Sequence, residues 1–449
     1  MKRRDLIRAG TGLAVAEVAA PLAKAKPGPN DRIRIALIGC GGMGGMNLKD
    51  FQSSPQVEIT CLCDADPNQI AKAQQLITGK APVVDRDFRK VLERKDVDAV
   101  IVATPDHWHA LIAVEACKAG KDVYVEKPAA TSVRESRLMV EAARHHNRVM
   151  QVGIQQRSGS HFQRAVSLVQ SGAIGTVVYA EAWNHGRNSR DGVGHRPDTQ
   201  PPPGMDWDMW LGPAPAAPYR SNIHPVMWRG YYEYGGGNLA DWGVHLLDII
   251  QWAMKLDAPQ SVHATGGKFW TDDDRNVPDT LNVVYQYPGA IVNFTHMNHC
   301  NYGRSGRYYG IIFHGSDAAL LLDRGGYEII PVTTKHIDPS GENYRGAFDD
   351  MIGTGTYFQS ARPAEKGSTS LQHMPHVDNF LSCVKTRKRP IGDIETGHQA
   401  SLPCHLGNIS YRVQQKLEWD GEKERIKNSD EGNKLLTRHY RSPWQLAGL

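Results

Sequence analysis

A short glycine-rich segment near the start constrains the fold of this chain more than any other feature of its sequence. A β-rich run at residues 33–38 leads directly into the segment GCGGMG at residues 39–44, which fits the pattern G-x-G-x-x-G. A second β-rich run, at residues 57–63, ends at Asp64, twenty residues after Gly44. In a dinucleotide-binding fold such glycines allow a tight turn and a close approach of pyrophosphate. An acid at this distance accepts hydrogen bonds from ribose hydroxyls.

These features predict a binding site for NAD. The phosphates would contact free N–H groups at the N-terminus of a helix that begins near Met43. Asp64 and the nearby Asp66 would repel the 2′-phosphate of NADP, so the sequence favours NAD. A glycine-rich turn that binds no ligand is the alternative interpretation.

Strand-like and helix-like segments alternate from residue 33 to residue 153. This alternation predicts a parallel sheet that binds its ligand at the carboxyl ends of the strands. Two polar loops, residues 104–109 and 126–128, follow predicted strands at those ends. The residues predicted to bind the cofactor are therefore Gly39, Gly41, Gly42, Met43, Gly44, Asp64, Thr104, Pro105, His107, His109, Glu126 and Lys127.

The glycine motif and the loop Glu126-Lys127-Pro128 resemble the Gfo/Idh/MocA family of glucose–fructose oxidoreductases and inositol dehydrogenases. A later segment, GGGNLADWGVHLLD at residues 235–248, resembles the active-site helix of that family. The resemblance spans roughly residues 31–410. It implies an α/β Rossmann domain followed by an α+β domain with an open, mostly antiparallel sheet. It also implies hydride transfer at a hydroxyl carbon of a sugar, cyclitol or glycoside.

We expect three parts in the chain. Residues 1–30 would be a signal peptide and linker, and residues 31–155 the NAD-binding domain. Residues 156–449 would form the substrate-binding domain, with C-terminal helices that the resemblance places against the first domain. Strand-like runs between residues 261 and 323 predict a meander sheet.

The residue types in the later segment support alcohol oxidation. Asp241 and His245 are four residues apart, so on a helix they share a face. Oxidation of an alcohol needs a base for the hydroxyl proton, and a carboxylate can orient and tune a histidine for that task. We predict His245 as the acid/base and Asp241 as its partner or as a ligand of a substrate hydroxyl. Lys127 would stabilise the alkoxide and relay the proton. A helix cap and an ordinary buried histidine are the alternative.

Predicted substrate contacts lie at the domain junction and in a long irregular segment. Gln155 and Arg157 either contact substrate or brace the junction. Residues 184–218 are too long for an ordinary connection, which indicates a functional loop. Trp228 and Tyr232 beyond it either stack on a sugar or belong to the core. The predicted substrate-binding residues are Gln155, Arg157, Trp228, Tyr232 and Asp241.

The first residues resemble a twin-arginine export signal. A basic run at residues 2–8 contains adjacent arginines, a weakly apolar stretch follows, and Ala23-Lys24-Ala25 fits a small-x-small cleavage site. We therefore expect a periplasmic protein, with a cytoplasmic protein as the alternative. No nicotinamide pool is evident outside the cytoplasm, so an enzyme there must hold its cofactor tightly and close its own redox cycle.

Two redox-neutral schemes meet that requirement. In one, a first sugar reduces the bound NAD and a second sugar reoxidises it. In the other, an NAD-dependent glycosidase oxidises C3, eliminates the C1 substituent, adds water and returns the hydride. Tyr232 and His185 are the candidates for the base that this second scheme needs at C2. A non-catalytic sensor of NAD or sugar is the opposing interpretation.

Composition excludes several other classes of protein. The net charge of +4 gives no electrostatic case for a nucleic-acid partner, and no apolar run is long enough to span a membrane. The seven cysteines lack zinc spacing, so we expect no metal site. An open sheet often buries its face against another subunit, and we therefore expect a homo-dimer or homo-tetramer.

Overall fold

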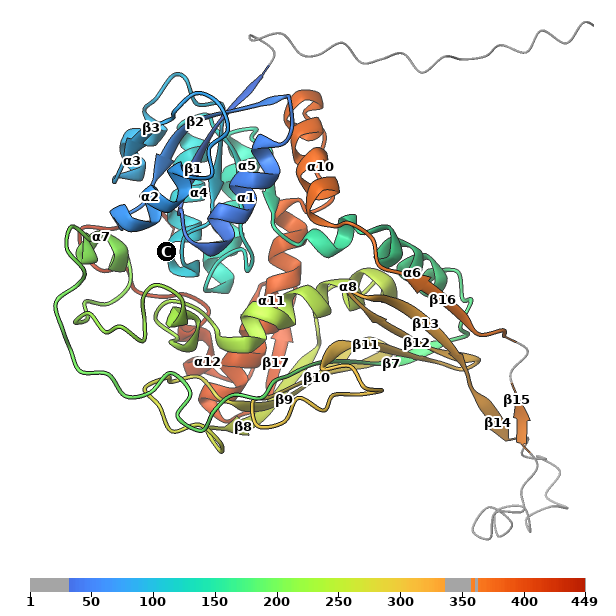
Figure 1. The fold of residues 1–449 in the computed structure, drawn as a ribbon. Helices are drawn as coiled ribbons and strands as arrows, with labels where there is room; N and C mark the ends of the chain where they lie inside the picture. Colours follow the sequence, from blue (N-terminus) through green and yellow to red (C-terminus); the bar gives the residue numbers. More distant parts are fainter. Residues whose placement is uncertain (1–31, 336–356, 360–361, 449) are drawn as a thin grey trace, which may run out of the picture.

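The computed structural model describes residues 32–335, 357–359 and 362–448. The predicted signal peptide and linker, residues 1–30, lie outside the described residues. The chain forms two domains that share long C-terminal helices (Figure 1). None of the helices within the described ranges is long and apolar enough to cross a membrane.

The first domain is a six-stranded parallel sheet with helices on both faces. Its strand order is β3-β2-β1-β4-β5-β6, which confirms the predicted Rossmann topology. The strands are β1 (Ile33–Ile38), β2 (Val57–Cys63), β3 (Val83–Asp85), β4 (Ala99–Val102), β5 (Asp122–Val125) and β6 (Met150–Val152). The helices are α1 (Gly42–Gln52), α2 (Pro67–Gln74), α3 (Phe88–Leu92), α4 (His109–Lys118) and α5 (Val133–His145).

Side-chain caps determine where several of these helices begin. The carboxylates of Asp66 and Asp87 accept hydrogen bonds from backbone N–H groups in the first turns of α2 and α3. Ser132 caps α5 in the same way through the N–H of Glu135. Such caps satisfy donors that a helix start leaves unpaired. They fix α2 directly after Asp64, beside the predicted ribose site.

The second domain is built on a ten-stranded sheet with the order β16-β13-β12-β11-β7-β10-β9-β8-β17-β18. It is mostly antiparallel, as predicted, but it is not a simple meander. β7 inserts between β11 and β10 and runs parallel to β10. The strands are β7 (Val177–His185), β8 (Ser261–Gly267), β9 (Thr280–Tyr287), β10 (Ala290–Met297), β11 (Tyr309–Gly315), β12 (Ala318–Asp323), β13 (Gly326–Pro331), β16 (Glu365–Ser368), β17 (Leu417–Asp420) and β18 (Arg425–Ile426). A separate pair, β14 (Thr333–Lys335) and β15 (Tyr357–Gln359), extends from the sheet.

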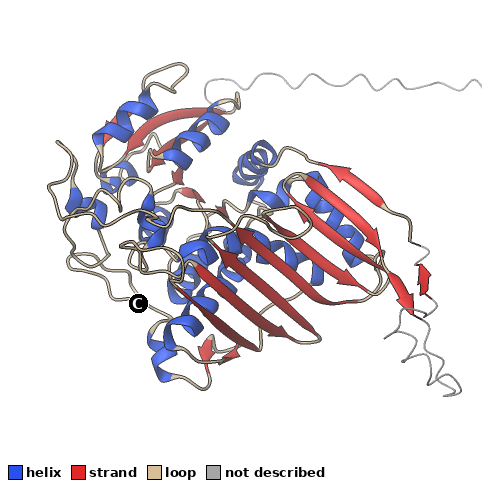
Figure 2. Cartoon of the chain, turned by 60° about the horizontal axis from the view of Figure 1, so that its bottom comes forward, coloured by secondary structure: helices blue, strands red, loops and turns tan. Residues whose placement is uncertain are grey.

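Helices cover one face of this sheet and leave the other face bare (Figure 2). The covering helices are α6 (Ser160–Gln170), α8 (Val244–Met254) and α11 (Ile394–Val413). On the bare face Val284, Ile291 and Ile330 are exposed. Alternation along the strands explains this pattern, because neighbouring side chains point to opposite faces.

Two C-terminal helices join the domains. α11 packs against α5 of the first domain and against α8 and β8 of the second. α10 (His373–Thr386) inserts Phe380 between Phe51 and Tyr124 of the first domain. Part of the chain beyond residue 156 therefore belongs to the core of the NAD-binding domain. The remaining helix, α12 (Asp430–Lys434), lies near the C-terminus.

Candidate active site

The glycine loop packs as tightly as the sequence motif predicts. Gly39 has φ +93°, and a Cβ there would lie 2.5 Å from the backbone of Ala103 and Thr104. A Cβ on Gly44 would overlap the carbonyl oxygen of Gly39. Both positions therefore require glycine so that α1 can start directly against β1 and β4.

Gly41 and Gly42 have a different role, because they face open space. A Cβ at either position would meet nothing within 4 Å, and both residues line a cleft of about 570 Å³. The N-terminus of α1, which carries no side-chain cap, points into this cleft. Free N–H groups beside bare glycine backbone form a cradle for pyrophosphate. The residues present thus fit a dinucleotide.

Asp64 lies at one end of the cleft. Its carboxylate accepts hydrogen bonds from the backbone N–H groups of Cys40, at 2.7 Å, and Asp66, at 2.9 Å. Burial raises the pKa of Asp64 to about 6, so the group is ionised at neutral pH. An ionised carboxylate held this way can accept hydrogen bonds from ribose hydroxyls.

A long segment of the second domain crosses over this end of the cleft. We call residues 193–235 the strap. It carries the short helix α7 (Trp207–Leu211) and has an apolar core of its own: Met205, Trp210, Leu211, Ala214, Tyr219, Ile223, Trp228, Tyr231 and Tyr234. Most of its aromatic side chains are thus buried inside the strap. Trp228 also lines the cleft, as do Trp210 and His224.

Polar contacts hold the strap to the NAD-binding domain. The backbone N–H of Asp206 donates to the carbonyl of Ala65, and Arg86 donates to the carbonyl of Gly204. His224 lies 3.5 Å from the carboxylate of Asp66. The strap therefore contacts the β2–α2 loop that carries Asp64.

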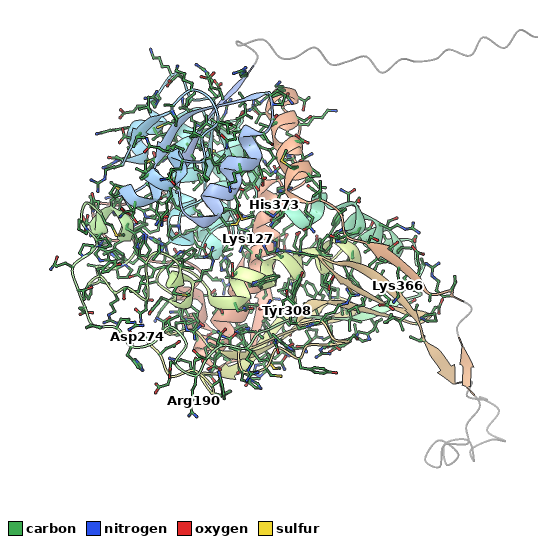
Figure 3. All side chains as sticks on the ribbon, in the orientation of Figure 1. Lys127, Arg190, Asp274, Tyr308, Lys366 and His373 are labelled. Atoms are coloured by element: carbon green, nitrogen blue, oxygen red, sulfur yellow. The ribbon has the colours of Figure 1, made fainter. Side chains whose placement is uncertain are left out.

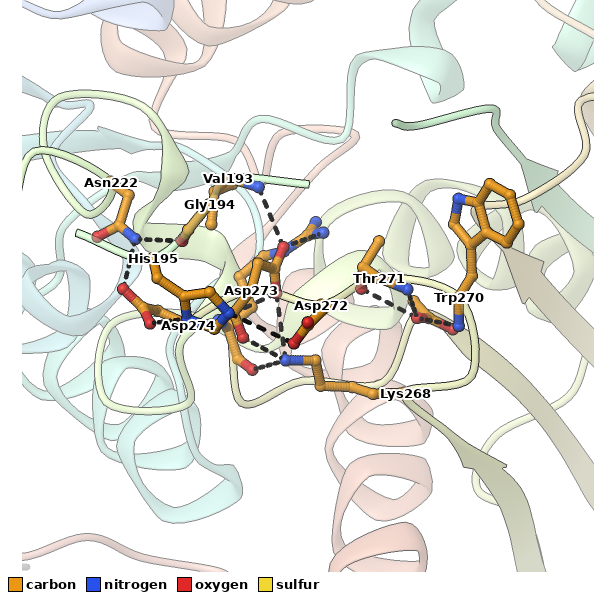
Figure 4. Close-up of polar contacts among 12 residues, drawn as sticks. Val193, Gly194, His195, Asn222, Lys268, Trp270, Thr271, Asp272, Asp273 and Asp274 are labelled. Carbon is orange, nitrogen blue, oxygen red and sulfur yellow. Dashed lines mark hydrogen bonds and ion pairs between the residues drawn. The ribbon is translucent and has the colours of Figure 1, made fainter. Parts of the chain in front are cut away.

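The other side of the strap is fixed to the loop after β8 (Figure 4). Asp274 accepts hydrogen bonds from His195, at 2.7 Å, and from the amide of Asn222, at 2.8 Å. Asp273 accepts one from the backbone N–H of Val193. Because it is anchored at both ends, the strap bridges the two domains over the cofactor cleft.

Lys127 lies at the opposite end of the cleft, where the domains meet (Figure 3). The Lys127–Pro128 peptide bond is cis. The Lys127 ammonium donates to the Asp241 carboxylate at 2.5 Å and to the Asp241 carbonyl at 3.0 Å. Arg229 of the strap donates to the same carboxylate oxygen at 3.1 Å. These cations hold the pKa of Asp241 below its ordinary value against the effect of burial.

Asp241 and His245 do not form the pair that their four-residue spacing predicts. The turn Leu239–Gly243 is π-helical, and from it the Asp241 carboxylate binds cations of two other segments, Lys127 and Arg229. Asp241 binds Lys127 instead, while the His245 Nδ1 is buried and has no hydrogen-bond partner among the described residues. Burial, followed by the charges of Lys127 and Arg324, lowers the pKa of His245. The imidazole is therefore neutral at neutral pH.

The other predicted site residues divide into those that line the cleft and those that do not. The cleft is lined by Gly39, Gly41, Gly42, Met43, Asp64, Thr104, Pro105, His109, Glu126, Lys127 and Trp228. Gly44 and His107 lie behind it: Gly44 packs on Gly39, and His107 contacts the Trp210 carbonyl at 3.0 Å.

The residues at the domain junction mainly brace it. Arg157 forms a buried ion pair with Asp248 at 2.7 Å, so Asp248 is not free to act on substrate. Gln155 contacts His373 at 3.3 Å. Tyr232 lies outside the cofactor cleft, in the wall of a small inner cavity.

Three further residues belong to the site although they were not predicted from the sequence: Asp106, Arg229 and Arg324. Asp106 lies in the wall between the cleft and the inner cavity, and burial raises its pKa to about 7. It lies within the loop 104–109, which was predicted to border the ligand, so its place in the sequence could have indicated a site residue. No sequence pattern marks Arg229 or Arg324, which reach the site only through the folds of the strap and of the second sheet.

Metal-ligating residues do not gather in this site. Across residues 32–335, 357–359 and 362–448, no group of three or more His, Cys, Asp or Glu side chains could hold a metal ion.

Three family models match the chain in succession. "Oxidoreductase family, NAD-binding Rossmann fold" matches residues 33–154, and "GFO/IDH/MocA C-terminal domain" matches residues 162–321. "Oxidoreductase family, C-terminal alpha/beta domain" matches residues 358–446. These matches confirm the predicted resemblance to Gfo/Idh/MocA domains.

Individual proteins agree with the family models. A glycosyl hydrolase family 109 protein of Solibacter usitatus is 34% identical over 206 residues, which are 41% of this chain and 46% of that protein. The chain thus spans about half the length of this curated relative. A levoglucosan dehydrogenase in complex with NADH and levoglucosan has a TM-score of 0.63 at 17% identity, covering 86% of this chain and 99% of its own. The aldose-aldose oxidoreductase of Caulobacter crescentus has a TM-score of 0.61 at 18% identity, with coverages of 86% and 99%. The structural likeness confirms the fold.

The two kinds of glycine in the loop should respond differently to substitution. Gly44→Ala forces α1 away from β1, so we expect a loss of about 2 kcal/mol or more and a Tm lower by about 5 °C. Gly41→Ala places a methyl group in the cradle and should leave Tm nearly unchanged while weakening NAD binding about tenfold or more. Calorimetry and NAD titration measure both effects. Equal NAD binding by Gly41→Ala and the parent protein would contradict the assigned cradle.

Asp106 should make the stability of the protein without added cofactor depend on pH. Its folded pKa of about 7 lies above the ordinary value of 3.8, so the unfolded chain ionises first as pH rises. As the pH rises from about 4 to about 7, the free energy of unfolding of the parent protein should therefore fall relative to that of Asp106→Asn. Each unit of difference in pKa corresponds to about 1.4 kcal/mol. Urea unfolding at several pH values tests this, and a pH-independent difference would refute it.

Proposed function

This chain is built from Gfo/Idh/MocA oxidoreductase domains, and we propose that it transfers hydride between tightly held NAD and a hydroxyl carbon of a sugar, cyclitol or glycoside. The observation that carries the proposal is the Lys127–Asp241 ion pair at the end of the dinucleotide cleft. It brings a proton donor and a carboxylate from different domains to the place opposite Asp64, where a bound dinucleotide would carry its nicotinamide.

Each polar group there has a task in alcohol oxidation. Bound NAD supplies the hydride acceptor. The Lys127 ammonium is positioned to hold the substrate oxygen and to stabilise negative charge on it as the hydroxyl proton leaves. Asp241 fixes Lys127 and can accept a hydrogen bond from a substrate hydroxyl. His245 is neutral, as a base must be before it acts, and the burial and nearby cations that lower its pKa also make it a weaker base than a free imidazole.

The strap supports tight retention of the cofactor. It covers the Asp64 end of the cleft and is bound to both domains, so release of a dinucleotide would require these contacts to open. Retention suits a redox-neutral cycle, in which the product of one step returns the hydride. The names of two relatives agree with such cycles, since one is an aldose-aldose oxidoreductase and the other a family 109 glycosyl hydrolase.

The glycosidase scheme is the second candidate, favoured by the name of that relative. It needs a base at C2 of the sugar, and neither residue considered from the sequence meets that need. Tyr232 lies in the inner cavity, and His185 is buried with its Nε2 3.1 Å from the Thr295 hydroxyl. Net oxidation or sugar-to-sugar transfer therefore remains the leading proposal.

We also propose that the protein is exported to the periplasm through a twin-arginine signal. The support is the basic run at residues 2–8 with the small-residue site at residues 23–25. A fusion of residues 1–30 to a reporter should reach the periplasm, and replacement of Arg3 and Arg4 by lysine should prevent this. A reporter that stays in the cytoplasm would refute the export proposal.

Lys127→Ala should abolish turnover and leave NAD binding nearly intact. We expect kcat to fall by about 100-fold to about 10,000-fold, because an electrophile and proton relay is lost. The matched control is Lys118→Ala, since Lys118 is exposed and its ion pair is with Glu115 on the same helix, α4. Reduction of bound NAD by a panel of sugars and glycosides provides the assay. Normal turnover by Lys127→Ala would show that the site is misassigned.

The bare face of the ten-stranded sheet is proposed to bind another copy of the chain. Light scattering should then give two or four times the mass of a single chain. Ile291→Glu places a charge on this face, where Ile291 is 44% exposed, and should yield single chains. Leu371→Glu, at a position that is exposed away from the sheet, is the control. A single-chain mass for the parent protein would contradict this assembly.

A further inference from the structure

Arg324 occupies the turn between β12 and β13, and several contacts hold that turn in place. The Arg324 carbonyl accepts a hydrogen bond from the Thr369 hydroxyl at 2.6 Å. The preceding Asp323 pairs with Arg307 at 2.9 Å and accepts from the N–H of Gly325. The backbone of Arg324 is therefore fixed, and its side chain extends from a rigid base.

The Arg324 side chain lies against the π-helical turn that leads into α8, the helix that carries His245. Its guanidinium lies over the ring of Trp242, 4.8 Å from the ring centre. Trp242 is the residue that follows Asp241 in the sequence. Its Nε donates to the amide oxygen of Gln156 at 3.3 Å, while the Gln156 amide N–H donates to the His245 carbonyl at 2.7 Å. One edge of the guanidinium is thereby tied to the backbone that carries His245.

The other edge of this guanidinium has no partner among the residues that the structure describes. None of their carboxylates lies within 4 Å of Arg324, and neither terminal nitrogen donates a hydrogen bond to them. Asp241, the acid within electrostatic reach, already binds Lys127 and Arg229. A half-buried cation without an anion carries a desolvation cost that a ligand can offset.

The surroundings suit a sugar ring. Trp242 and Tyr309 lie side by side, with ring centres 4.9 Å apart, and both are half-buried. Partly open aromatic rings beside hydroxyl-binding groups form an amphipathic wall of the kind that sugars contact. Trp242 contacts the Arg324 guanidinium and follows Asp241 directly in the sequence, so this wall links Arg324 to the segment that carries the Lys127–Asp241 pair.

We propose that Arg324 recognises an oxyanion on the substrate, so that the natural substrate is an acidic sugar or its glycoside, carrying a carboxylate or phosphate. The inference rests on the proposed function, because it takes the reacting hydroxyl to lie at Lys127. The free edge of the guanidinium offers the parallel N–H groups that bind such an oxyanion through two hydrogen bonds. Because the Gln156 amide joins Arg324 to the His245 carbonyl, it fixes the position of the bound anion relative to α8.

Paired ligands test the proposal in the protein loaded with NAD. Methyl glycosides of glucose, galactose and mannose are compared with the corresponding uronides and 6-phosphates, first by calorimetric binding and then by reduction of bound NAD. At least one acid should bind about 10-fold to about 100-fold tighter than its neutral counterpart, as expected for a charge-assisted pair. The comparison of uronide with phosphate identifies the preferred oxyanion.

Three variants assign the effect to Arg324. Arg324→Met should remove the preference for acid over neutral sugar, and Arg324→Lys should retain part of it. Arg412→Met is the matched control, because Arg412 also lies over an aromatic ring, that of Tyr232, and should keep the full preference. An acid preference that survives in Arg324→Met would overturn the proposal.

The two readouts separate this inference from the proposed function. If neutral sugars reduce bound NAD and no acid in the panel binds tighter, the substrate inference fails and the function stands. If an acid binds through Arg324 but bound NAD is never reduced and no glycoside is cleaved, the recognition stands and the function fails. If no acid binds more tightly and no sugar reacts, both are wrong.

Discussion

The ion pair between Lys127 and Asp241 is the interaction on which the proposed chemistry depends. Lys127 follows a strand of the parallel sheet, and Asp241 belongs to the π-helical turn before α8 in the second domain. α11 packs on α5 of the first domain and on α8 and the π-helical turn of the second, so it connects the two domains directly. The geometry of the site therefore follows from how the two domains are joined, since neither domain alone contains both groups.

The strap likewise joins parts of both domains, in this case around the cofactor cleft. Its aromatic core makes it a small folded unit, and it places Arg229 on Asp241 at one end and His224 near Asp66 at the other. One segment thus contacts both ends of the cleft. A cleft closed in this way favours a cofactor that stays bound through many turnovers. Such retention is what a redox-neutral enzyme outside the cytoplasm would require.

Local patterns in the sequence predicted the first domain well and the active site less completely. The glycine motif, the alternating strands and Asp64 all follow rules of short range, and the structure places them as predicted. Asp241 does not pair with His245, which was one of the two roles expected of it. Its carboxylate binds Lys127 and Arg229 instead, and such long-range contacts leave no local pattern in the sequence. Arg324 was missed because its role arises from a hairpin turn that lies 79 residues from His245 along the chain. The insertion of β7 into the second sheet likewise depends on long-range pairing.

The cofactor content of the purified protein shows whether NAD stays bound beneath the strap. The protein is purified without added nucleotide and denatured, and the released supernatant is assayed for NAD(H) and NADP(H). A retained cofactor under the strap predicts close to one NAD(H) per chain with little NADP(H). A protein that emerges empty and binds NAD only weakly would contradict the account, because the strap would then not retain the cofactor and no closed redox cycle would operate.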